Sequence, residues 1–490
     1  MIYYKGKDRG LIVVSNRLPF YKNIDEKGKI VWAKAAGGLI TALEPIIIQA
    51  EGTWLGWDGH VVEEIKEPGK VVTYDVKEVS PDETGKEESY SLGCVPLTEE
   101  EVEKYYNRFS NGTLWALFHY FFEKSHIDYP SWRTYLDINK RFADYVDKIA
   151  SEDDIIWIQD FHLFLTPYFL RKIRPKQEIH FFLHIPFPHM DIFSILPWQR
   201  QILESLLCCN TIGFHHKQYF RNFMGAVEVY RKEMKISGKK SIAEKIKTHA
   251  YANPISIDFN LIDRTSRKEE VIKRKNEIRE QAACPKLIIG VDRIDYSKGI
   301  KERLLGLEYL LTEHPEIKEQ FFYYQLVIPS RESVETYQKL KKEIDEIIGR
   351  INGKFSTGLW SPVHYNYGTV PFEELVALYL ASDVALVTPL RDGMNLVCKE
   401  YVAAHSDNDG VLVLSKFAGA IAEIKNCLPV NPYSIEDIAN AIHQALHMPK
   451  GERRKRMGKM RKNIQSNNIK TWLNHCLQHF EMSKGPFIPE

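Results

Sequence analysis

The sequence predicts an α/β protein built from two doubly wound, Rossmann-like parallel sheets. Two observations lead to this fold class: short apolar runs rich in β-branched residues recur along the chain, and amphipathic segments lie between them. Such runs are typical of strands buried on both faces, and their alternation with helices is typical of parallel sheets. The predicted strands are 11–14, 155–158, 179–183, 287–291, 324–328 and 411–414, and helices are predicted at 301–313 and 334–348.

A change in sequence character marks a domain boundary. The 490 residues are sufficient for two or three domains with separate cores. Between Asn253 and Asn276 a Pro-containing, strand-like stretch gives way to a charged, helix-like one, and a new strand begins at Leu287. A single barrel of eight repeats is the competing topology, but the mixed region 52–110 interrupts any even spacing. The expected domains are 1–258 and 259–455, followed by a final helical segment, 456–490, that packs back on the first domain.

Composition excludes several classes of function. Lys plus Arg (66) nearly cancels Asp plus Glu (65), so no overall charge attracts nucleic acid or an anionic membrane. The seven cysteines lack C-x-x-C spacing, so their pattern does not predict a metal site. Scattered cysteines of this kind are typical of a protein in a reducing compartment. The N-terminus lacks the apolar core of a secretion signal, and no apolar run is as long as a membrane span. We therefore expect a soluble, cytoplasmic protein with small-molecule ligands and no nucleic-acid or membrane partner, and the sequence leaves a homo-oligomer open.

The segment 382–400 is the most informative part of the chain. An apolar run, a polar turn with a glycine and a helix-like stretch follow one another there. This order predicts a strand, a loop and a helix N-terminus whose amides and dipole favour a diphosphate. Asp392 on the loop could hold sugar hydroxyls, and Glu400 could reach a ribose. The alternative is that Asp392 and Asn395 cap the helix and Glu400 is a solvated surface charge.

A second loop carries two cations. It follows the first predicted strand of the second domain and precedes a helix, which places Arg293 and Lys298 at the same sheet edge as Asp392. Two fixed cations would neutralise a diphosphate and stabilise a departing nucleotide. The alternative is that they are structural charges paired with Asp292 and Asp295.

Polar residues also follow the predicted strands of the first domain. His184 precedes a proline-rich turn and Asp160 follows the neighbouring strand, so both are expected at one sheet edge, as in a binding crevice. A lone histidine, however, is more often structural. Arg17 ends the first strand, and Gly38 begins a helix where a small residue lets backbone approach a ligand. A tight turn with a surface arginine is the alternative for that region.

Two aromatic residues of the first domain have two interpretations. Tyr106 and Trp115 lie in a segment that mixes aromatic and polar residues. They could form aromatic walls for a sugar, or they could belong to the hydrophobic core, and the sequence leaves both open.

Together these motifs resemble the retaining glycosyltransferases of the trehalose-6-phosphate synthase type. The resemblance runs from about Leu11 to the final helix, and 291–299 and 388–404 are its most specific segments. It implies the GT-B fold, in which an acceptor-binding domain and a nucleotide-sugar-binding domain face each other across a cleft. It also implies transfer of glucose from a nucleotide-glucose to glucose-6-phosphate with retention, which gives α,α-trehalose-6-phosphate. UDP-glucose is the expected donor, and the sequence leaves ADP or GDP open.

The resemblance also implies roles for individual residues. It places Arg293 and Lys298 on the diphosphate, Asp392 on the donor sugar and His184 near that sugar's 6-hydroxyl, and these four form the expected catalytic set. Further donor-binding positions are Gly38, Glu400 at the ribose, and the amides of Asn395, Leu396 and Val397. The acceptor-binding positions are Arg17, Tyr106, Trp115 and Arg331 around the phosphate, Trp57 as a further aromatic residue, and Asp160 on the glucose hydroxyls.

No metal and no cofactor are expected. Two cations and a helix N-terminus can offset the leaving-group charge that many transferases offset with a divalent ion. We expect a front-face mechanism without an enzyme nucleophile. A separate phosphatase is expected to remove the product's phosphate.

Two departures from the family pattern keep other acceptors open. Gln159 stands where the family usually has His, and Ser256 stands where it usually has Gly. A glucosylglycerol-phosphate synthase-like enzyme that uses glycerol-3-phosphate or another phosphorylated polyol is therefore an alternative. Another is a glycogen- or sucrose-synthase-like transferase, and a third is a non-catalytic regulatory homologue that binds sugar phosphate.

Overall fold

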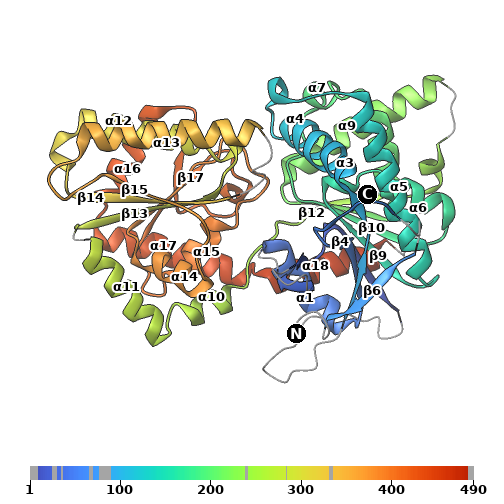
Figure 1. Cartoon of the computed structure of the whole chain (residues 1–490), viewed down its shortest axis with the longest axis horizontal. Helices are drawn as coiled ribbons and strands as arrows, with labels where there is room; N and C mark the ends of the chain where they lie inside the picture. Colours follow the sequence, from blue (N-terminus) through green and yellow to red (C-terminus); the bar gives the residue numbers. More distant parts are fainter. Residues whose placement is uncertain are drawn as a thin grey trace. The chain divides into compact units, whose positions relative to one another are not determined.

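Both predicted parallel sheets are present in the computed structural model, each in its own unit (Figure 1). The structure describes residues 9–24, 30–34, 37–65, 70–76, 90–237, 241–282, 284–329 and 335–483. The chain divides into unit 1, Met1–Ile255 with Lys470–Glu490, and unit 2, Ser256–Ile469. The predicted fold class, an α/β protein with two Rossmann-like domains, is confirmed.

Unit 1 is built on an eight-stranded sheet with the order β12-β11-β10-β9-β1-β4-β7-β6. Neighbouring strands are parallel except for β6 and β7. The strands are β1 (Leu11–Arg17), β4 (Thr53–Trp57), β6 (Val72–Asp75), β7 (Ser91–Cys94), β9 (Ile155–Gln159), β10 (Glu178–Leu183), β11 (Thr211–Phe214) and β12 (His249–Ala252), with the small pairs β2 (Phe20–Ile24) and β3 (Ile30–Lys34), and β5 (Val61–Val62) and β8 (Leu97–Thr98).

Helices cover both faces of this sheet. The helices α1 and α18 lie on one side, and α5, α6 and α9 lie on the other (Figure 1). The bounds are α1 (Gly38–Gln49), α3 (Glu99–Glu101), α4 (Ala116–Phe118), α5 (Tyr129–Ile149), α6 (Thr166–Ile173), α7 (Met190–Phe193), α8 (Gln199–Leu206), α9 (Lys217–Ser237) and α18 (Ile469–Met482). A π-helix, η1 (Val102–Trp115), and short 3-10 helices, among them η3 (Phe161–Leu163), complete the unit.

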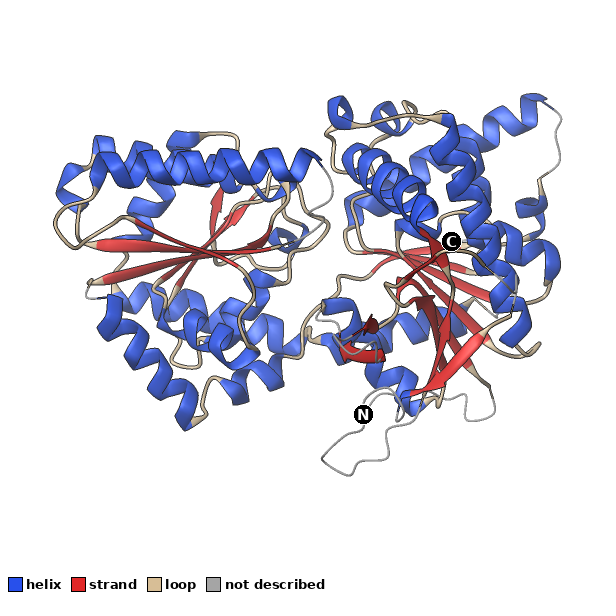
Figure 2. Cartoon of the chain, in the orientation of Figure 1, coloured by secondary structure: helices blue, strands red, loops and turns tan. Residues whose placement is uncertain are grey.

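Unit 2 has a fully parallel six-stranded sheet with the order β15-β14-β13-β16-β17-β18. Helices α12, α13 and α16 cover one face, and α10, α11, α14, α15 and α17 cover the other (Figures 1 and 2). The strands are β13 (Lys286–Arg293), β14 (Phe321–Ile328), β15 (Val363–Tyr367), β16 (Val384–Val387), β17 (Val411–Ser415) and β18 (Leu428–Val430). The helices are α10 (Phe259–Thr265), α11 (Glu269–Ala282), α12 (Ile300–Glu313), α13 (Glu335–Phe355), α14 (Phe372–Ala381), α15 (Val397–Ala404), α16 (Ile435–Leu446) and α17 (Lys450–Ser466), with the 3-10 turns η5 (Tyr296–Lys298), η6 (Pro315–Ile317) and η7 (Gly419–Ala422).

The C-terminal part of the chain divides differently from the expectation. Residues 470–482 do pack on unit 1, where Trp472 and Phe480 contact the ring of Trp157. The assignment of 456–469 to that segment is wrong, because these residues belong to unit 2. Helix α17 inserts its apolar side chains into unit 2, and its Arg461 donates to the Val402 carbonyl.

The strand order gives each sheet a topological switch point. In unit 1, β1 continues to β4 on one side, while β9 begins the strands on its other side. In unit 2 the same reversal lies between β13 and β16. In open α/β sheets, ligands bind at the carboxyl ends of strands beside such a reversal. Each unit therefore has one edge position where a site is expected. Among the described residues, no helix is both long and apolar enough to cross a bilayer.

Candidate functional site

Three loops meet at the switch point of unit 2. The Leu390 amide, in the loop after β16, donates to the Ser297 carbonyl in the loop after β13 at 2.8 Å. The Asp392 amide donates to the Phe417 carbonyl after β17 at 3.2 Å, and the Gly419 amide returns a bond to the Asp392 carbonyl at 3.1 Å. Backbone bonds thus fix the loops that follow three adjacent strands.

Lys298 and Asp392 form an ion pair inside this loop cluster. Lys298 Nζ lies 2.6 Å from Asp392 Oδ2, and the two side chains are 11% and 12% exposed. Asp392 also accepts from Asn395 Nδ2 at 3.1 Å and from the Met394 amide at 3.3 Å. Because an ammonium group has three donors, the bond to Asp392 leaves Lys298 capacity for a phosphate oxygen. The predicted meeting of these two residues is confirmed.

Gly299 allows the first two loops to touch. Its φ is +64°, and a Cβ there would lie 2.3 Å from the Thr388 carbonyl oxygen. A close approach also occurs at Gly419, where a Cβ would lie 2.1 Å from the Gly393 carbonyl oxygen. The sequence reasoning missed Gly419, which lies in a run of small residues, 418–420, shortly after the predicted strand 411–414.

Replacing Gly299 with alanine is expected to separate these loops. The left-handed backbone adds about 1–2 kcal/mol of strain, and the new methyl group collides with the Thr388 carbonyl. We expect nucleotide affinity, measured by calorimetry, to fall at least about tenfold. The matched control is Gly349→Ala in α13, where no atom lies within 4 Å of the new Cβ and nucleotide affinity should not change. Equal affinities for both variants would contradict the assigned role.

The N-terminus of α15 faces the same loops. Asn395 has a φ of +78°, and its Oδ1 accepts from the Cys398 amide at 3.1 Å. The capping alternative is therefore correct for Asn395, whereas Asp392 bonds within its own loop. Among the first amides of α15, that of Cys398 is bonded to Asn395, and those of Lys399 and Glu400 donate to the Leu396 carbonyl at 2.9 Å. The use of the amides of Asn395, Leu396 and Val397 by a phosphate stays a prediction.

Glu400 is not a solvated surface charge. It is half-buried on α15, and its Oε2 accepts from the Tyr379 hydroxyl at 3.2 Å. Burial raises the pKa of the Glu400 carboxyl above its ordinary value. A group that is desolvated in this way is a strong hydrogen-bond acceptor for a hydroxyl. The contact with a ribose stays a prediction.

Arg303 is a buried charge beneath the loop cluster that sequence reasoning missed. Its Nη1 lies 2.6 Å from Asp292 Oδ2, and the side chains are 0% and 1% exposed. Its Nε donates to Thr388 Oγ1 at 2.9 Å and its Nη2 to the Lys298 carbonyl at 3.4 Å. Burial disfavours the charge, but Asp292 holds the pKa of Arg303 above its ordinary value. Arg303 therefore ties together the loops that carry Lys298 and Asp392.

Lys298 does not pair with Asp292 or Asp295, as the structural alternative expected; its ion pair is with Asp392. Asp292 binds Arg303, and Asp295 accepts from the Ser297 amide at 2.9 Å. Arg293 is exposed at the carboxyl end of β13, at the same sheet edge as the loop cluster. Its contact with a diphosphate stays a prediction.

In unit 1, four adjacent strands end in predicted site residues. Arg17 and Trp57 are the last residues of β1 and β4, and Asp160 and His184 follow β9 and β10. The strands run in the order β10-β9-β1-β4, so these residues span the switch point between β9 and β1. The sequence correctly placed Asp160 and His184 at one sheet edge and Arg17 at the end of the first strand, whereas Trp57 was named only through the family resemblance.

Arg17 lies among aromatic rings. Its guanidinium carbon is 4.0 Å from the ring centre of Trp57 and 5.5 Å from that of Tyr106. A Cβ at Gly59 would lie 2.8 Å from Arg17 Nη1, so the missing side chain makes room for the guanidinium. Cation–π contacts preorganise a planar cation that can bind an anion bidentately. Arg17 is exposed, as the surface-arginine alternative expected, and it is held against these rings.

The π-helix η1 brings Tyr106 and Trp115 to one side. They are nine residues apart, which would place them on opposite faces of an α-helix with 3.6 residues per turn. The wider i→i+5 turn moves them toward the same face. Tyr106 stacks on His162 with ring centres 5.7 Å apart, and Trp115 packs on the adjacent Phe161 at 5.9 Å. Trp115 is buried, so its core interpretation is supported.

The side chain of Asp160 accepts a hydrogen bond from the backbone of His184. Asp160 has a φ of +71°, and its Oδ1 accepts from the His184 amide at 3.1 Å. The His184 ring donates from Nε2 to Gln159 Oε1 at 2.9 Å, which leaves Nδ1 with a lone pair. Burial lowers the pKa of His184 to about 3, so the ring is neutral at physiological pH. Gln159, at the position where the family pattern has His, thus orients His184.

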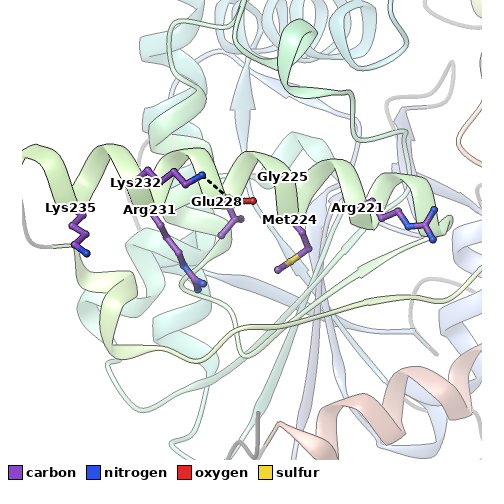
Figure 3. Close-up of a pocket in the computed structure, with 8 residues that line it drawn as sticks. Arg221, Met224, Gly225, Glu228, Arg231, Lys232 and Lys235 are labelled. Carbon is purple, nitrogen blue, oxygen red and sulfur yellow. Dashed lines mark hydrogen bonds and ion pairs between the residues drawn. The ribbon is translucent and has the colours of Figure 1, made fainter. Parts of the chain in front are cut away.

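The structure does not test the predicted roles of two further residues, Gly38 and Arg331. Gly38 is the first residue of α1, and its approach to a donor stays a prediction. Arg331 lies outside the described residues. A shallow hollow on the surface of α9 contains none of the predicted site residues (Figure 3). It is lined by Arg221, Met224, Gly225, Val227, Glu228, Arg231, Lys232 and Lys235.

Comparisons with known proteins agree with this geometry. The sequence matches the family model of glycosyltransferase family 20 over residues 9–482. It is 38% identical over 485 residues to the trehalose-6-phosphate synthase of Mycobacterium marinum, covering 96% of this chain and 93% of that protein.

Solved structures match the fold over nearly the whole chain. One is an α,α-trehalose-phosphate synthase (UDP-forming) from Burkholderia xenovorans in complex with glucose-6-phosphate, with a TM-score of 0.83, 31% identity, and coverage of 96% of this chain and 100% of that one. Another is an E. coli structure described as trehalose-6-phosphate bound with UDP-2-fluoro glucose, with a TM-score of 0.83, 34% identity, and coverage of 96% and 98%.

Proposed function

The chain belongs to glycosyltransferase family 20, and from that premise we propose that it transfers glucose from UDP-glucose to glucose-6-phosphate, giving α,α-trehalose-6-phosphate and UDP. The single observation that carries the proposal is the Lys298–Asp392 pair at the switch point of unit 2. A nearly buried cation beside a helix N-terminus suits a diphosphate, and a buried carboxylate suits sugar hydroxyls. The E. coli structure with UDP-2-fluoro glucose supports the choice of donor.

The proposed reaction proceeds on one face of the sugar. The bond between the anomeric carbon and the diphosphate oxygen breaks, and the acceptor hydroxyl attacks from the side on which the diphosphate leaves. A departing diphosphate oxygen takes the proton of that hydroxyl, so the configuration is retained without an enzyme nucleophile. Lys298 and Arg293 stabilise the charge that develops on the diphosphate. His184 stays neutral and serves as a hydrogen-bonding group.

Unit 1 supplies those acceptor-binding residues of this proposal that the structure describes. Arg17 over Trp57 and Tyr106 offers a preoriented fork for a phosphate, and the carboxylate of Asp160 suits glucose hydroxyls. The B. xenovorans complex with glucose-6-phosphate supports this acceptor. The alternative acceptor, glycerol-3-phosphate, would need the phosphate subsite but not Asp160. A cytoplasmic location and a separate phosphatase stay predictions.

One experiment separates the candidate functions. The full chain is incubated with UDP-, ADP- or GDP-glucose and with glucose-6-phosphate, glycerol-3-phosphate or a glucan primer, and products are identified by mass. We expect UDP-glucose with glucose-6-phosphate to give the highest kcat/KM. A preference for glycerol-3-phosphate or the primer would replace the proposed acceptor, and complete inactivity with every pair would overturn the enzyme function.

Replacing Arg17 with alanine is expected to weaken acceptor binding. A lost charge-assisted bond of about 1.5–3 kcal/mol corresponds to a rise of about 10- to 150-fold in KM for glucose-6-phosphate. KM for UDP-glucose should not change, because Arg17 has no proposed donor contact. The matched control is Arg108→Ala on η1, where the arginine is exposed and pairs with Glu103 at 3.7 Å. If both variants behave alike, Arg17 does not bind the phosphate.

Chelation of divalent ions is expected to leave turnover unchanged. Lys298, Arg293 and the N-terminus of α15 offset the leaving-group charge in the proposed mechanism. Initial rates in excess EDTA should therefore equal those in magnesium buffer within about twofold. A rate that collapses in EDTA and returns with Mg²⁺ would contradict the metal-independent mechanism.

A further inference from the structure

Three imidazole rings lie in a row where α12 and α16 end in unit 2. His314 follows α12, His443 lies in the last turn of α16, and His447 follows that helix. The ring centres of His314 and His443 are 4.3 Å apart, as are those of His443 and His447. The two helices are packed closely at Gly306 of α12, where an added Cβ would lie only 2.5 Å from Ile438 of α16. The three rings therefore lie at the ends of two closely packed helices.

The carboxylate of Glu316 lies close to two of these rings. Within the described ranges, His314, Glu316 and His443 form one group in which each residue offers a ligand atom within 4.8 Å of the others. His314 Nδ1 lies 3.1 Å from Glu316 Oε1. Two ligands of a tetrahedral zinc ion, each about 2.0–2.1 Å from the metal, are about 3.3 Å apart. The His314 and Glu316 side chains are 35% and 64% exposed, so small rotations can bring all three atoms to that spacing.

The ring of His447 lies beside that of His443 and is not one of the three grouped residues. His447 Nδ1 donates to the His443 carbonyl at 2.9 Å, which leaves the lone pair of its ring on Nε2. Neutral imidazole is the form that binds a metal ion.

We propose that His314, Glu316 and His443 form a binding site for a divalent transition-metal ion of the zinc type, with water completing its coordination. Two imidazole nitrogens and one carboxylate oxygen suit Zn²⁺, whereas Mg²⁺ and Ca²⁺ prefer oxygen ligands alone. The site is separate from the loop cluster around Lys298 and takes no part in the proposed transfer. A bound ion would link the end of α12 to the end of α16.

The test uses the full chain after removal of metal with EDTA and dialysis. Zinc is titrated calorimetrically into the unaltered protein, His443→Ala and Glu316→Gln, and Co²⁺ is added to separate metal-free samples for absorption spectra, because it would not displace bound zinc. We expect one ion per chain, at least about tenfold weaker binding in each variant, and cobalt d–d bands without a thiolate charge-transfer band. The matched control is His364→Ala, which removes an exposed histidine of the same unit and should bind zinc like the unaltered chain.

Each other outcome overturns the site. Absence of binding would show that the three rings only stack, and unchanged affinity in His443→Ala and Glu316→Gln would place the ion elsewhere. A thiolate charge-transfer band would assign the ion to cysteines. Circular dichroism of both variants establishes that they are folded, and Glu316→Gln keeps the test valid if His443→Ala does not fold.

Discussion

Replacing Lys298 with alanine is expected to lower kcat by about 10²- to 10³-fold, the loss typical when one preorganised donor to a developing negative charge is removed. Lys298 is nearly buried and fixed by Asp392 at 2.6 Å, so its charge is desolvated and needs no reorganisation as the diphosphate departs. KM for glucose-6-phosphate should change little, because no contact with the acceptor is assigned to Lys298. Initial rates at saturating substrate measure the effect.

Two comparisons separate this role from stability. Lys301→Ala removes an exposed lysine of the adjacent helix, which pairs with Glu343 at 3.0 Å, and should leave kcat unchanged. In Lys298→Ala, Asp392 keeps its bonds from Asn395 and Met394, so thermal unfolding should show a folded protein. A folded Lys298→Ala variant with near-normal kcat would refute the assigned role.

Replacing Arg303 with methionine is expected to lower the free energy of unfolding of unit 2 by about 3–5 kcal/mol. The change leaves the buried Asp292 carboxylate without its cation and Thr388 without its donor. Activity should also fall, since the loops that carry Lys298 and Asp392 lose their common support. Urea unfolding followed by circular dichroism measures the stability.

The control for this change is an exposed arginine of the same unit. Arg350→Met removes a surface pair with Glu308 in which Arg350 is 51% exposed, and it should alter stability by less than about 1 kcal/mol. Removing both buried charges in Arg303→Met/Asp292→Leu should restore part of the stability, because no unpaired charge remains. If Arg303→Met is no less stable than Arg350→Met, the buried pair does not support the loops.

Local sequence patterns predicted much of the fold and of the site in unit 2. The strand, loop and helix of 382–400 are signalled by residues adjacent in sequence, as is the loop that carries Lys298. Parallel strands align their carboxyl ends, so the meeting of Lys298 with Asp392 followed from topology. Arg303 was missed because its partners come from several elements, and their packing is not visible as a sequence period.

Two features could not be predicted from local sequence patterns: the orientation of two aromatic residues in unit 1 and the end of unit 2. Tyr106 and Trp115 could not be placed, because their relative orientation depends on the π-helical turn, for which the sequence has no clear signal. The boundary at 455 was wrong because Met457, Met460 and Ile464 of α17 are buried in unit 2.

The most direct test of the proposed reaction is a proton NMR spectrum of the product formed from UDP-glucose and glucose-6-phosphate. Retention at the donor sugar, with attack by the α-anomer of glucose-6-phosphate, predicts a disaccharide phosphate in which both anomeric protons have the small coupling of α-glucosides, accompanied by UDP. A β-glucosidic product, or free glucose and UDP without a disaccharide, would contradict the proposed front-face transfer to glucose-6-phosphate.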